Sequence, residues 1–390
     1  GIVPFAGWEM PVRYASILEE HQAVRRGAGL FDVAHMGVLE VAGPNAERFL
    51  DALTTNYVAW LENGEGQYSY LLDPDGRCID DILVYRRAWD RFMVVVNAAN
   101  ADHDLAWLRA AASGDVSIDR RHPGKRPPLP VAIRDLKDAA SGADRRVDLA
   151  LQGPRSLDCL SRLTDPRSAE RIGILKRFEF ADVALAEIPV MVSRTGYTGE
   201  PIGFELYVHP DRALELWQKI LAVGEPLGVR TAGLGARDST RMEAGFPLHG
   251  HELAGDHGVT PLEAGYEPFV MFHKPFFVGR RAMLANFFER TMTIVRFELT
   301  DEDSRLVRAG DPIASAKSKV IGHVTSCTAA GGVPYGLAYV DRKFADPGTE
   351  IYVFRLPPRA TIEKPKTELQ PGDPVILHAR GRIVPRFARL

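Results

Sequence analysis

The sequence predicts an α+β fold with a C-terminal domain made of β-strands alone. Helical and strand patterns alternate up to about residue 290, whereas short strands separated by Gly and Pro turns dominate from residue 291 onward. Several early strands are joined by hairpin turns, which make antiparallel pairs and disfavour a parallel, doubly wound sheet. The 390 residues exceed what one hydrophobic core usually supports, so two or three domains are expected.

The first predicted element is a helix over residues 16–30. Ser16 and Glu19 have the spacing of a capping box, and Gly27 and Gly29 end the helix. Its apolar face is predicted from the positions that follow the helical period: Ile17, Leu18, His21 and Val24. The next elements are a strand at 38–42, a helix over 45–53, a hairpin over 66–87 that turns at residues 73–76, a buried strand over 91–98 and a helix over 101–112.

Residues 113–146 are rich in Gly, Pro, Arg, Lys and Asp, which predicts a long surface excursion around one short strand at 129–136. Beyond it we expect a strand at 148–152, helices near 155–163 and 211–223, and a Gly-entered helix within 231–245. The strand patterns after residue 291 predict a small barrel or sandwich, with a polar loop at about 355–371.

Charge and cysteine content exclude several classes of function. Lys+Arg number 48 and Asp+Glu 51, which gives a net charge of −3, whereas proteins that bind nucleic acid through its phosphates are clearly basic. The three cysteines, Cys78, Cys159 and Cys327, are few and far apart in the sequence, and no two of them have the CxxC spacing. Neither a disulfide framework nor a zinc site is therefore expected. A reducing compartment is the simplest interpretation.

Targeting and nucleotide-binding signals give further expectations. The sequence has no apolar stretch of membrane-spanning length, no secretory signal, no P-loop and no GxGxxG motif. We therefore expect a cytoplasmic protein without a membrane partner. The sequence does not begin with Met, and a transit peptide before Gly1 would instead direct the protein to the mitochondrial matrix.

The first candidate cluster is VVVNAANADHD, residues 94–104, where a buried strand leads into a helix. One interpretation is structural: Asn100 caps the helix, and Asp102 and Asp104 balance its dipole. The functional interpretation is that a carboxylate at this strand–helix junction faces a pocket and manages a proton.

The second cluster, RTGYTGE at residues 194–200, is either a tight turn with a solvated Glu200 or a ligand-binding loop. In the second case Tyr197 would stack on a flat ring, and Glu200 would accept two parallel N–H bonds from an amino-pyrimidine edge. The third cluster, GLGARDSTRMEAG at residues 233–245, places Arg237 and Arg241 on one helix face. Either Asp238 pairs with Arg241 in an ordinary ion-paired helix, or the arginines bind a ligand carboxylate.

The fourth cluster contains His249, His251 and His257. A zinc site needs three or four convergent ligands with a definite spacing, which this loop lacks, so no metal is expected.

These clusters and their neighbours resemble one family. PFAGWEMPVRY, GLFDVAHMG, LTTN, GQYSYLLDPDGRCIDDILVY, VVNAANADHDLAWL, ALQGP, SRTGYTGE, GFELYV, AGLGARDSTRMEAG, PLHGHEL, TPLEAG and GLAYV follow one another from residue 3 to about residue 341. In this order they resemble the aminomethyltransferases, or T-proteins, of the glycine cleavage system. The wider family also contains folate-dependent demethylases and folate-binding proteins.

The resemblance implies a three-domain clover-leaf arrangement around a central channel that binds tetrahydrofolate. It implies that an aminomethyl group, carried on the lipoyl arm of an H-protein, is converted to methylene-tetrahydrofolate, ammonia and the reduced arm. Asp104 would handle the proton at the reacting nitrogens. Tyr197 and Glu200 would hold the pterin, Arg237 would lie at the folate site, and Asn97 would lie at the same strand end as Asp104. The protein would be a monomer or weak dimer.

The implied domains are a folate-binding region, 1–290, and a C-terminal barrel, 291–390. Within the first, two subdomains would interleave, about 1–50 with 147–290, and 51–146.

Several departures from the family pattern leave the one-carbon donor open. Residues 266–277 replace the usual LGW and Val-Lys pattern, with Pro268 in place of the Trp and Phe269 beside it. TGEPIGFE carries one extra residue, and residues 113–146 and about 355–371 resemble insertions. A folate-dependent demethylase of a small methylated donor is therefore an alternative. A non-catalytic folate-binding assembly factor is a further alternative. Members of that branch carry a Lys-Gly-Cys motif, which this sequence lacks near PFFVGRRAM.

Overall fold

The computed structural model describes residues 1–301, 306–329, 332–355 and 365–388. These residues form two compact units. Unit 1 comprises Gly1–Arg237 and Pro268–Leu284, and unit 2 comprises Asp238–Glu267 and Ala285–Leu390. The chain therefore passes between the units after residues 237, 267 and 284.

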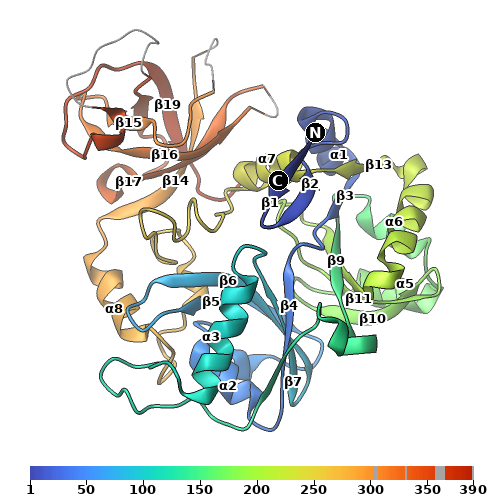
Figure 1. Cartoon of the computed structure of the whole chain (residues 1–390). Coiled ribbons are helices and arrows are strands. Elements are labelled where there is room, and N and C mark those ends of the chain that lie inside the picture. Colours follow the sequence, from blue (N-terminus) through green and yellow to red (C-terminus); the bar gives the residue numbers. More distant parts are fainter. Residues whose placement is uncertain (302–305, 330–331, 356–364, 389–390) are drawn as a thin grey trace. The chain divides into compact units, whose positions relative to one another are not determined.

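Unit 1 contains a six-stranded sheet in which β13 pairs with β3 in parallel and the other neighbours are antiparallel. One face of this sheet forms a hydrophobic core with α4, α5 and α6 (Figure 1). The strands in spatial order are β10 (Phe180–Leu185), β11 (Ile188–Ser193), β12 (Gly203–Val208), β9 (Val147–Gln152), β3 (Ala28–Asp32) and β13 (Val229–Ala232). The helices are α4 (Ser156–Ser161), α5 (Pro166–Gly173) and α6 (Pro210–Gly224).

A five-stranded antiparallel sheet forms the other layer of unit 1. Its order is β5 (Gly66–Leu72), β6 (Cys78–Ala88), β7 (Arg91–Val96), β4 (Gly37–Ala42) and β8 (Ala132–Asp135). Helices α2 (Ala46–Leu53) and α3 (Ala101–Ser113) cover one face of it (Figure 1). The opposite face packs against the six-stranded sheet through residues such as Tyr85, Met93, Met191 and Tyr207.

Alternation along β6 decides which side chains face which layer. Ile82 and Val84 belong to the core under α2 and α3, whereas Tyr85 belongs to the core between the two sheets. Asp80 therefore faces the helices and Asp81 faces the six-stranded sheet. The two carboxylates of the candidate site therefore lie on opposite faces of β6.

The remaining elements of unit 1 are a two-stranded hairpin, helix α1, the first parts of two further helices, and short 3-10 turns. They are β1 (Ile2–Phe5), β2 (Trp8–Pro11), α1 (Ile17–Arg26), the first part of α7 (Leu234–Ala244), η1 (Val58–Trp60), η2 (Ala139–Asp144), η3 (Glu225–Leu227), and parts of η4 (Glu267–Phe269) and α8 (Arg280–Glu289).

Unit 2 contains a closed barrel with a buried apolar interior. Its strands in spatial order are β14 (Met292–Leu299), β17 (Tyr335–Asp341), β16 (Val320–Thr328), β15 (Pro312–Ser315), β18 (Glu350–Val353) and β19 (Ala379–Val384), and its 3-10 turns are η5 (Arg342–Phe344) and η6 (Lys366–Glu368). The predicted α+β class with a C-terminal β-domain is confirmed, and of the two predicted forms the domain is a barrel.

Several local predictions need correction. The first helix ends at Arg26 with Gly27 as its C-cap, and Gly29 lies inside β3. Leu18 is exposed, whereas Glu20 is buried because its carboxylate accepts the main-chain N–H groups of Tyr14 and Gly233 at 2.6 and 2.8 Å. The predicted Ser16 cap is confirmed, since its hydroxyl accepts from the N–H of residue 19.

The region 113–146 is more than a surface excursion. Its strand β8 pairs with β4. Lys137 Nζ also donates to the main-chain oxygens of Ala34, His35 and Met36 at 2.7, 3.2 and 3.1 Å. Residues 356–364 of the second predicted insertion lie outside the described part of the chain. Within the described residues, no helix has the length and apolarity needed to cross a membrane.

Candidate functional site

A cluster of carboxylates and amides lies where β6 and β7 meet the start of α3. Asp80 accepts the main-chain N–H and the side-chain amide of Asn97, each at 2.8 Å, and the amide of Asn100 at 2.5 Å. Asn100 occupies the N-cap position of α3, but its side chain makes no capping bond. The predicted capping role of Asn100 is therefore wrong, because its amide donates to Asp80 instead.

Asp104, one turn into α3, is 0% exposed. Burial, and next the charge of Asp80, raise the pKa of Asp104 to about 10. In the described part of the chain no donor reaches either of its carboxyl oxygens. At neutral pH Asp104 is therefore protonated and can share its proton with Asp80. The sequence assigned Asp104 a direct role in proton transfer, and that role stays a prediction.

Asp81 lies on the opposite face of β6 and is half-buried. Its carboxylate accepts the phenol O–H of Tyr68 and the amide of Asn97, both at 2.8 Å. The Asn97 amide thus bridges Asp80 and Asp81. Asp81 was not among the candidate residues predicted from the sequence. The available signal was the acid pair in CIDDILV, because alternation along a strand gives two adjacent acids different environments.

A second group of site residues lies in the loop between β11 and β12 and on α7. The Arg237 guanidinium carbon is 5.0 Å from the centre of the Tyr197 ring, a cation–π geometry. Gln152 supports this loop, since its amide donates to the carbonyl of Thr195 at 3.0 Å and accepts from Thr198 at 3.1 Å. A Cβ at Gly196 would lie 1.7 Å from Gln152 Oε1, so a larger residue at this position would displace the Gln152 amide.

Glu200, predicted to hold an amino-pyrimidine, is engaged inside the protein. Its Oε1 lies 2.7 Å from Arg25 of α1, and its side chain is 8% exposed. Glu200 is therefore not the solvated turn residue of the structural interpretation, and its carboxylate already has a cationic partner.

Glu205 on β12 interacts with the charge of Arg237, and the sequence analysis did not single it out. Its carboxylate accepts the Tyr207 hydroxyl at 2.9 Å. Burial raises the pKa of Glu205, while the Tyr207 hydrogen bond and the charge of Arg237 oppose that rise. Asp148, opposite Tyr207 in the sheet, also has a raised pKa, because of burial and then the charge of Glu205.

His35 adds to this electrostatic environment. Burial, and next the positive charges of Arg237 and Lys137, lower the pKa of His35 to about 3. His35 is therefore neutral at physiological pH and adds no charge near Arg237.

Arg241 follows the structural interpretation of the third cluster. In unit 2 its side chain is buried and pairs with Asp238 at 2.7 Å and with Glu252 at 2.6 Å. It also donates to the hydroxyl of Ser326 at 3.0 Å. Arg241 is thus committed to an internal network, so the predicted two-arginine ligand site reduces to Arg237.

The candidate residues of unit 1 fall into two groups, and none of the contacts described here connects one group to the other. Asn97 and Asp104 meet through Asp80, and Tyr197 meets Arg237. Among the described residues, no group of three or more His, Cys, Asp or Glu side chains could hold a metal ion, His249, His251 and His257 included.

The altered segment 266–277 contributes an aromatic side chain near Asp81. The ring centres of Phe269 and Tyr68 are 4.9 Å apart in an edge-on arrangement. Phe269, which follows Pro268, therefore supplies an aromatic ring beside the tyrosine that donates to Asp81.

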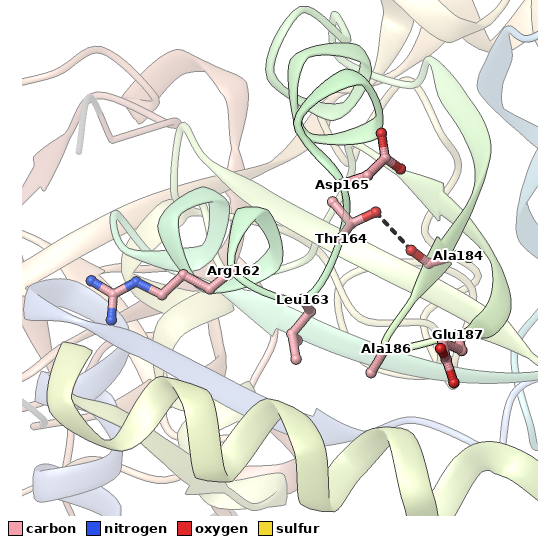
Figure 2. Close-up of a pocket in the computed structure, with 7 residues that line it drawn as sticks. All are labelled: Arg162, Leu163, Thr164, Asp165, Ala184, Ala186 and Glu187. Carbon is pink, nitrogen blue, oxygen red and sulfur yellow. Dashed lines mark hydrogen bonds between the residues drawn. The ribbon is translucent and has the colours of Figure 1, made fainter.

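A surface pocket of about 380 Å³ lies elsewhere in unit 1, between the end of α4 and the turn after β10 (Figure 2). Thr164 and Asp165 line one side of it, and Ala184 and Glu187 line the other. Thr164 donates its hydroxyl to the carbonyl of Ala184 at 2.7 Å. None of the candidate site residues lines this pocket, so it is not the candidate site.

Comparison with known proteins assigns the chain to a family. Residues 1–274 match the GCVT N-terminal domain, and residues 293–363 match the glycine cleavage T-protein C-terminal barrel domain. The chain therefore belongs to the glycine cleavage T-protein family. It is an enzyme, a transferase of the aminomethyltransferase class.

Individual relatives agree with this assignment. The aminomethyltransferase of Thermoanaerobacter sp. (strain X514) is 40% identical over 358 residues, which cover 90% of this chain and 89% of the relative. That of Bacillus subtilis (strain 168) is 37% identical over 356 residues, 90% of each chain. The crystal structure of glycine cleavage system aminomethyltransferase T from Bartonella henselae superposes with a TM-score of 0.76 at 29% identity, over 99% of this chain and 93% of that one.

Proposed function

We propose that the protein transfers the one-carbon unit of an aminomethyl group, carried on the lipoyl arm of an H-protein, to tetrahydrofolate, and releases ammonia. The observation that carries the proposal is the grouping of Tyr197, Arg237 and Glu205 in a chain of this family. An aromatic face suits a pterin ring, a buried carboxylate suits its amino-pyrimidine edge, and a guanidinium suits a carboxylate of the tail.

The residues present fit tetrahydrofolate. Asp148 Oδ1 is buried and accepts no hydrogen bond within the described part of the chain, and Glu205 lies close enough to raise its pKa. Buried acids of this kind suit a ligand edge that presents N–H donors, because an unmatched buried acceptor is costly. The site residues proposed for binding are Tyr197, Arg237, Glu205 and Asn97. Glu200 supports the loop through Arg25.

When bound, tetrahydrofolate supplies the two nitrogen atoms that take up the one-carbon unit. In our proposal Asp81 accepts and returns the proton at the reacting amine, because it is the half-buried carboxylate of the acid cluster. Tyr68 and Asn97 orient Asp81 through their hydrogen bonds. Asp104 keeps a proton beneath the site and shares it with Asp80. These residues orient the reacting groups and stabilise the charge that develops on them, and the reaction needs no protein nucleophile.

The test supplies aminomethylated H-protein and tetrahydrofolate and follows methylene-tetrahydrofolate and ammonia. We expect both products in equal amounts, with the lipoyl arm released as a dithiol. Folate binding without turnover would contradict the proposal. A small N-methylated amine in place of the carrier protein, with methyl-tetrahydrofolate and the demethylated amine as the products followed, tests the demethylase alternative, which the Phe269 segment favours. If neither donor reacts while folate binds, the assembly-factor alternative remains.

A further inference from the structure

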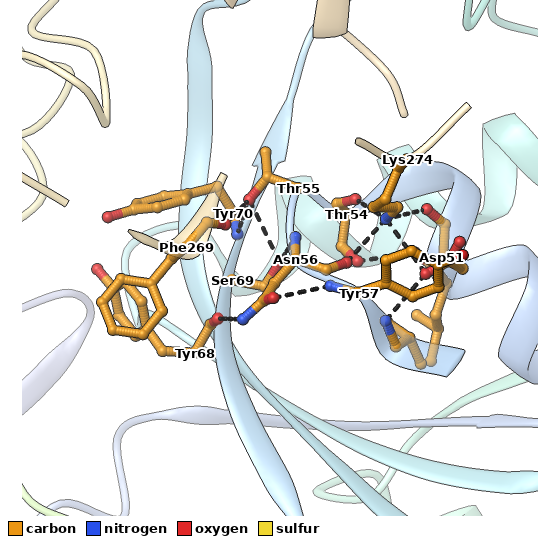
Figure 3. A network of polar contacts seen from close by, with 12 residues as sticks. Asp51, Thr54, Thr55, Asn56, Tyr57, Tyr68, Ser69, Tyr70, Phe269 and Lys274 are labelled. Atoms are coloured by element: carbon orange, nitrogen blue, oxygen red, sulfur yellow. Dashed lines mark hydrogen bonds and ion pairs between the residues drawn. The ribbon is translucent and has the colours of Figure 1, made fainter. Parts of the chain in front are cut away.

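Lys274 forms a buried polar centre in unit 1. Its side chain is 0% exposed, and its Nζ donates to the main-chain oxygens of Asp51, Thr54 and Asn56 at 2.5, 2.8 and 2.7 Å (Figure 3). The three acceptors match the three N–H donors of an ammonium group. Burial lowers the pKa of Lys274 to about 8, although the Asp51 carboxylate 3.2 Å away opposes that decrease.

The position of this ammonium explains why the chain uses a lysine here. The carbonyls of the last helical turn have no partners within a helix, and a cation near them is stabilising. Helix α2 has no basic residue in its last turn. Lys274 supplies the missing donors and positive charge from a distant part of the sequence.

Hydrogen bonds extend from this centre to the altered segment. Thr55 donates its hydroxyl to the carbonyl of Phe269 at 2.9 Å and accepts the N–H of Met271 on its own carbonyl at 3.0 Å. The N–H of Val278 donates to the carbonyl of Ala52 at 3.1 Å. Residues 51–57 and 268–278 are therefore joined along their length, as Figure 3 shows for Thr55, Phe269 and Lys274.

The joined segments hold Tyr68 at two points. The Asn56 amide donates to the carbonyl of Tyr68 at 2.9 Å, which holds its main chain. The Phe269 ring packs edge-on against the Tyr68 ring at 4.9 Å, which holds its side chain. The phenol of Tyr68 then donates to Asp81 at 2.8 Å.

We propose that Lys274 is a positioning residue for Asp81. By joining residues 51–57 to residues 268–278, it fixes the Tyr68 ring, and thus the phenol donor of Asp81, in the geometry that the one-carbon step requires. Lys274 touches no reacting atom, and its effect passes through Asn56, Phe269 and Tyr68. The kinetic readout of this inference rests on the proposed function, whereas its structural readout does not.

The main experiment compares Lys274→Met, Tyr68→Phe and the double variant of the full chain. Misplacement of a catalytic group by about 1 Å costs on the order of 100-fold in rate, so each single variant should lower kcat by about 10- to 100-fold. The KM for tetrahydrofolate should change by less than about threefold, because uniform substrate binding is not removed. The double variant should be no slower than the slower single variant, since both changes interrupt one pathway.

The structural readout is amide hydrogen exchange. Lys274→Met should accelerate exchange at Met271 and Asn56, whose N–H groups bond to Thr55 and Ser69. This measurement needs no turnover. If the wild type does not form methylene-tetrahydrofolate, the proposed function fails, and unchanged exchange at these amides would separately overturn the positioning role.

Two further variants separate positioning from a general loss of stability. Thr55→Val keeps the side-chain shape but removes the hydroxyl that donates to Phe269, so it should lower kcat. When it is combined with Tyr68→Phe, the loss of kcat should be smaller than the product of the two single losses. Leu216→Ala truncates a buried residue of α6 and should lower the free energy of unfolding by about 2–5 kcal/mol while kcat stays within about twofold. Multiplicative effects of Lys274→Met and Tyr68→Phe, or an unchanged kcat in Lys274→Met or Thr55→Val, would overturn the inference.

Discussion

Three aspartates within one cluster differ in burial and in hydrogen bonding. Asp80 is buried but accepts three hydrogen bonds, from Asn97 and Asn100. Asp104 is buried without a donor among the described residues, and its pKa rises to about 10. Asp81 is half-buried and accepts hydrogen bonds from Tyr68 and Asn97. Environment, more than residue type, therefore underlies the acid–base roles that we propose for these aspartates.

The first prediction separates the roles of two acids. Asp81→Asn should lower turnover by about 100-fold or more, because it removes the carboxylate that we propose accepts the proton. Asp104→Asn should retain turnover within a few fold, because asparagine resembles the neutral acid that is already present. Steady-state kinetics with the carrier protein and tetrahydrofolate measure both. The opposite result, with loss of turnover in Asp104→Asn alone, would restore the direct role that the sequence assigned to Asp104.

The second prediction concerns stability against pH. The pKa of Asp104 is raised in the folded state, so the folded protein binds a proton that the unfolded chain releases above about pH 4. This group therefore lowers stability progressively as the pH rises from about 4 toward 10. Asp104→Asn should be more stable than the wild type at pH 8, with a smaller advantage at pH 5, as measured by thermal unfolding. A constant difference across this range would contradict the raised pKa.

The third prediction distinguishes two glutamates. Glu205→Gln should raise the dissociation constant of tetrahydrofolate by about 10- to 100-fold, the effect of losing a charge-assisted hydrogen bond. Glu200→Gln should raise it by less than about threefold, because Glu200 is paired with Arg25 at 2.7 Å. Isothermal titration measures both constants. Equal effects of the two variants would refute the assignment of the pterin edge to Glu205.

The sequence indicated which residue types would form the site but could not decide their environments. It singled out Asn97, Tyr197 and Arg237, whose roles as folate-binding residues remain predictions. It did not distinguish Asp81 from Asp80, because strand register decides which of two adjacent acids faces the helices. Nor could it show that Arg25 meets Glu200, since these two residues are 175 positions apart in the chain.

At the scale of elements, the start of α7 depends on close main-chain packing. A Cβ on Gly233 would lie 2.6 Å from the main-chain oxygens of Pro11 and Val12. The Gly233 N–H also donates to the buried Glu20 at 2.8 Å. The position of α7, and with it Arg237, therefore depends on the segment before α1.

The fourth prediction tests this dependence. Gly233→Ala should weaken tetrahydrofolate binding by about 10-fold, because the clash is with main-chain atoms and α7 must shift. Gly173→Ala is a matched control, since the nearest atom to its added Cβ is a Leu157 side-chain carbon at 3.9 Å. Binding affinity is the measurement. Unchanged affinity in Gly233→Ala would show that α7 absorbs the change without moving Arg237.

Elements with strong local signals were predicted well. The capping box at Ser16 and Glu19 located α1, and the hairpin turn at 73–76 located β5 and β6. The region 113–146 was harder to interpret, because its composition is that of a loop while β8 is held by pairing with β4. Long-range pairing of this kind leaves no local pattern in the sequence.

At the scale of the whole molecule, unit 2 includes residues that precede the barrel strands in the sequence. Arg241 and Glu252 form a buried ion pair at 2.6 Å, and Ser326 of β16 donates to Glu252 at 2.6 Å. Burial alone would raise the pKa of Glu252, but Arg241 and Ser326 outweigh it and lower this pKa. Residues 238–267 are thus part of the folded unit that contains the barrel.

The fifth prediction follows from this ion pair. Glu252→Gln should lower the free energy of unfolding of unit 2 by about 3–5 kcal/mol, because it leaves Arg241 buried without its partner charge. The double variant Arg241→Met with Glu252→Gln should lose less, since no unpaired buried charge remains. Urea unfolding followed by barrel-specific hydrogen exchange measures the loss. A double variant less stable than Glu252→Gln would contradict this account.

The strand order of the six-stranded sheet has a consequence for synthesis on the ribosome. β3, near the N-terminus, lies between β9 and β13, so it is fully paired only after residue 232 has emerged. At about 5–20 residues per second, the roughly 200 intervening residues take about 10–40 s to translate. The five-stranded sheet is complete once residue 135 has emerged. We expect the nascent chain to fold that sheet first, while β3 waits with an unpaired edge that a ribosome-associated chaperone can protect.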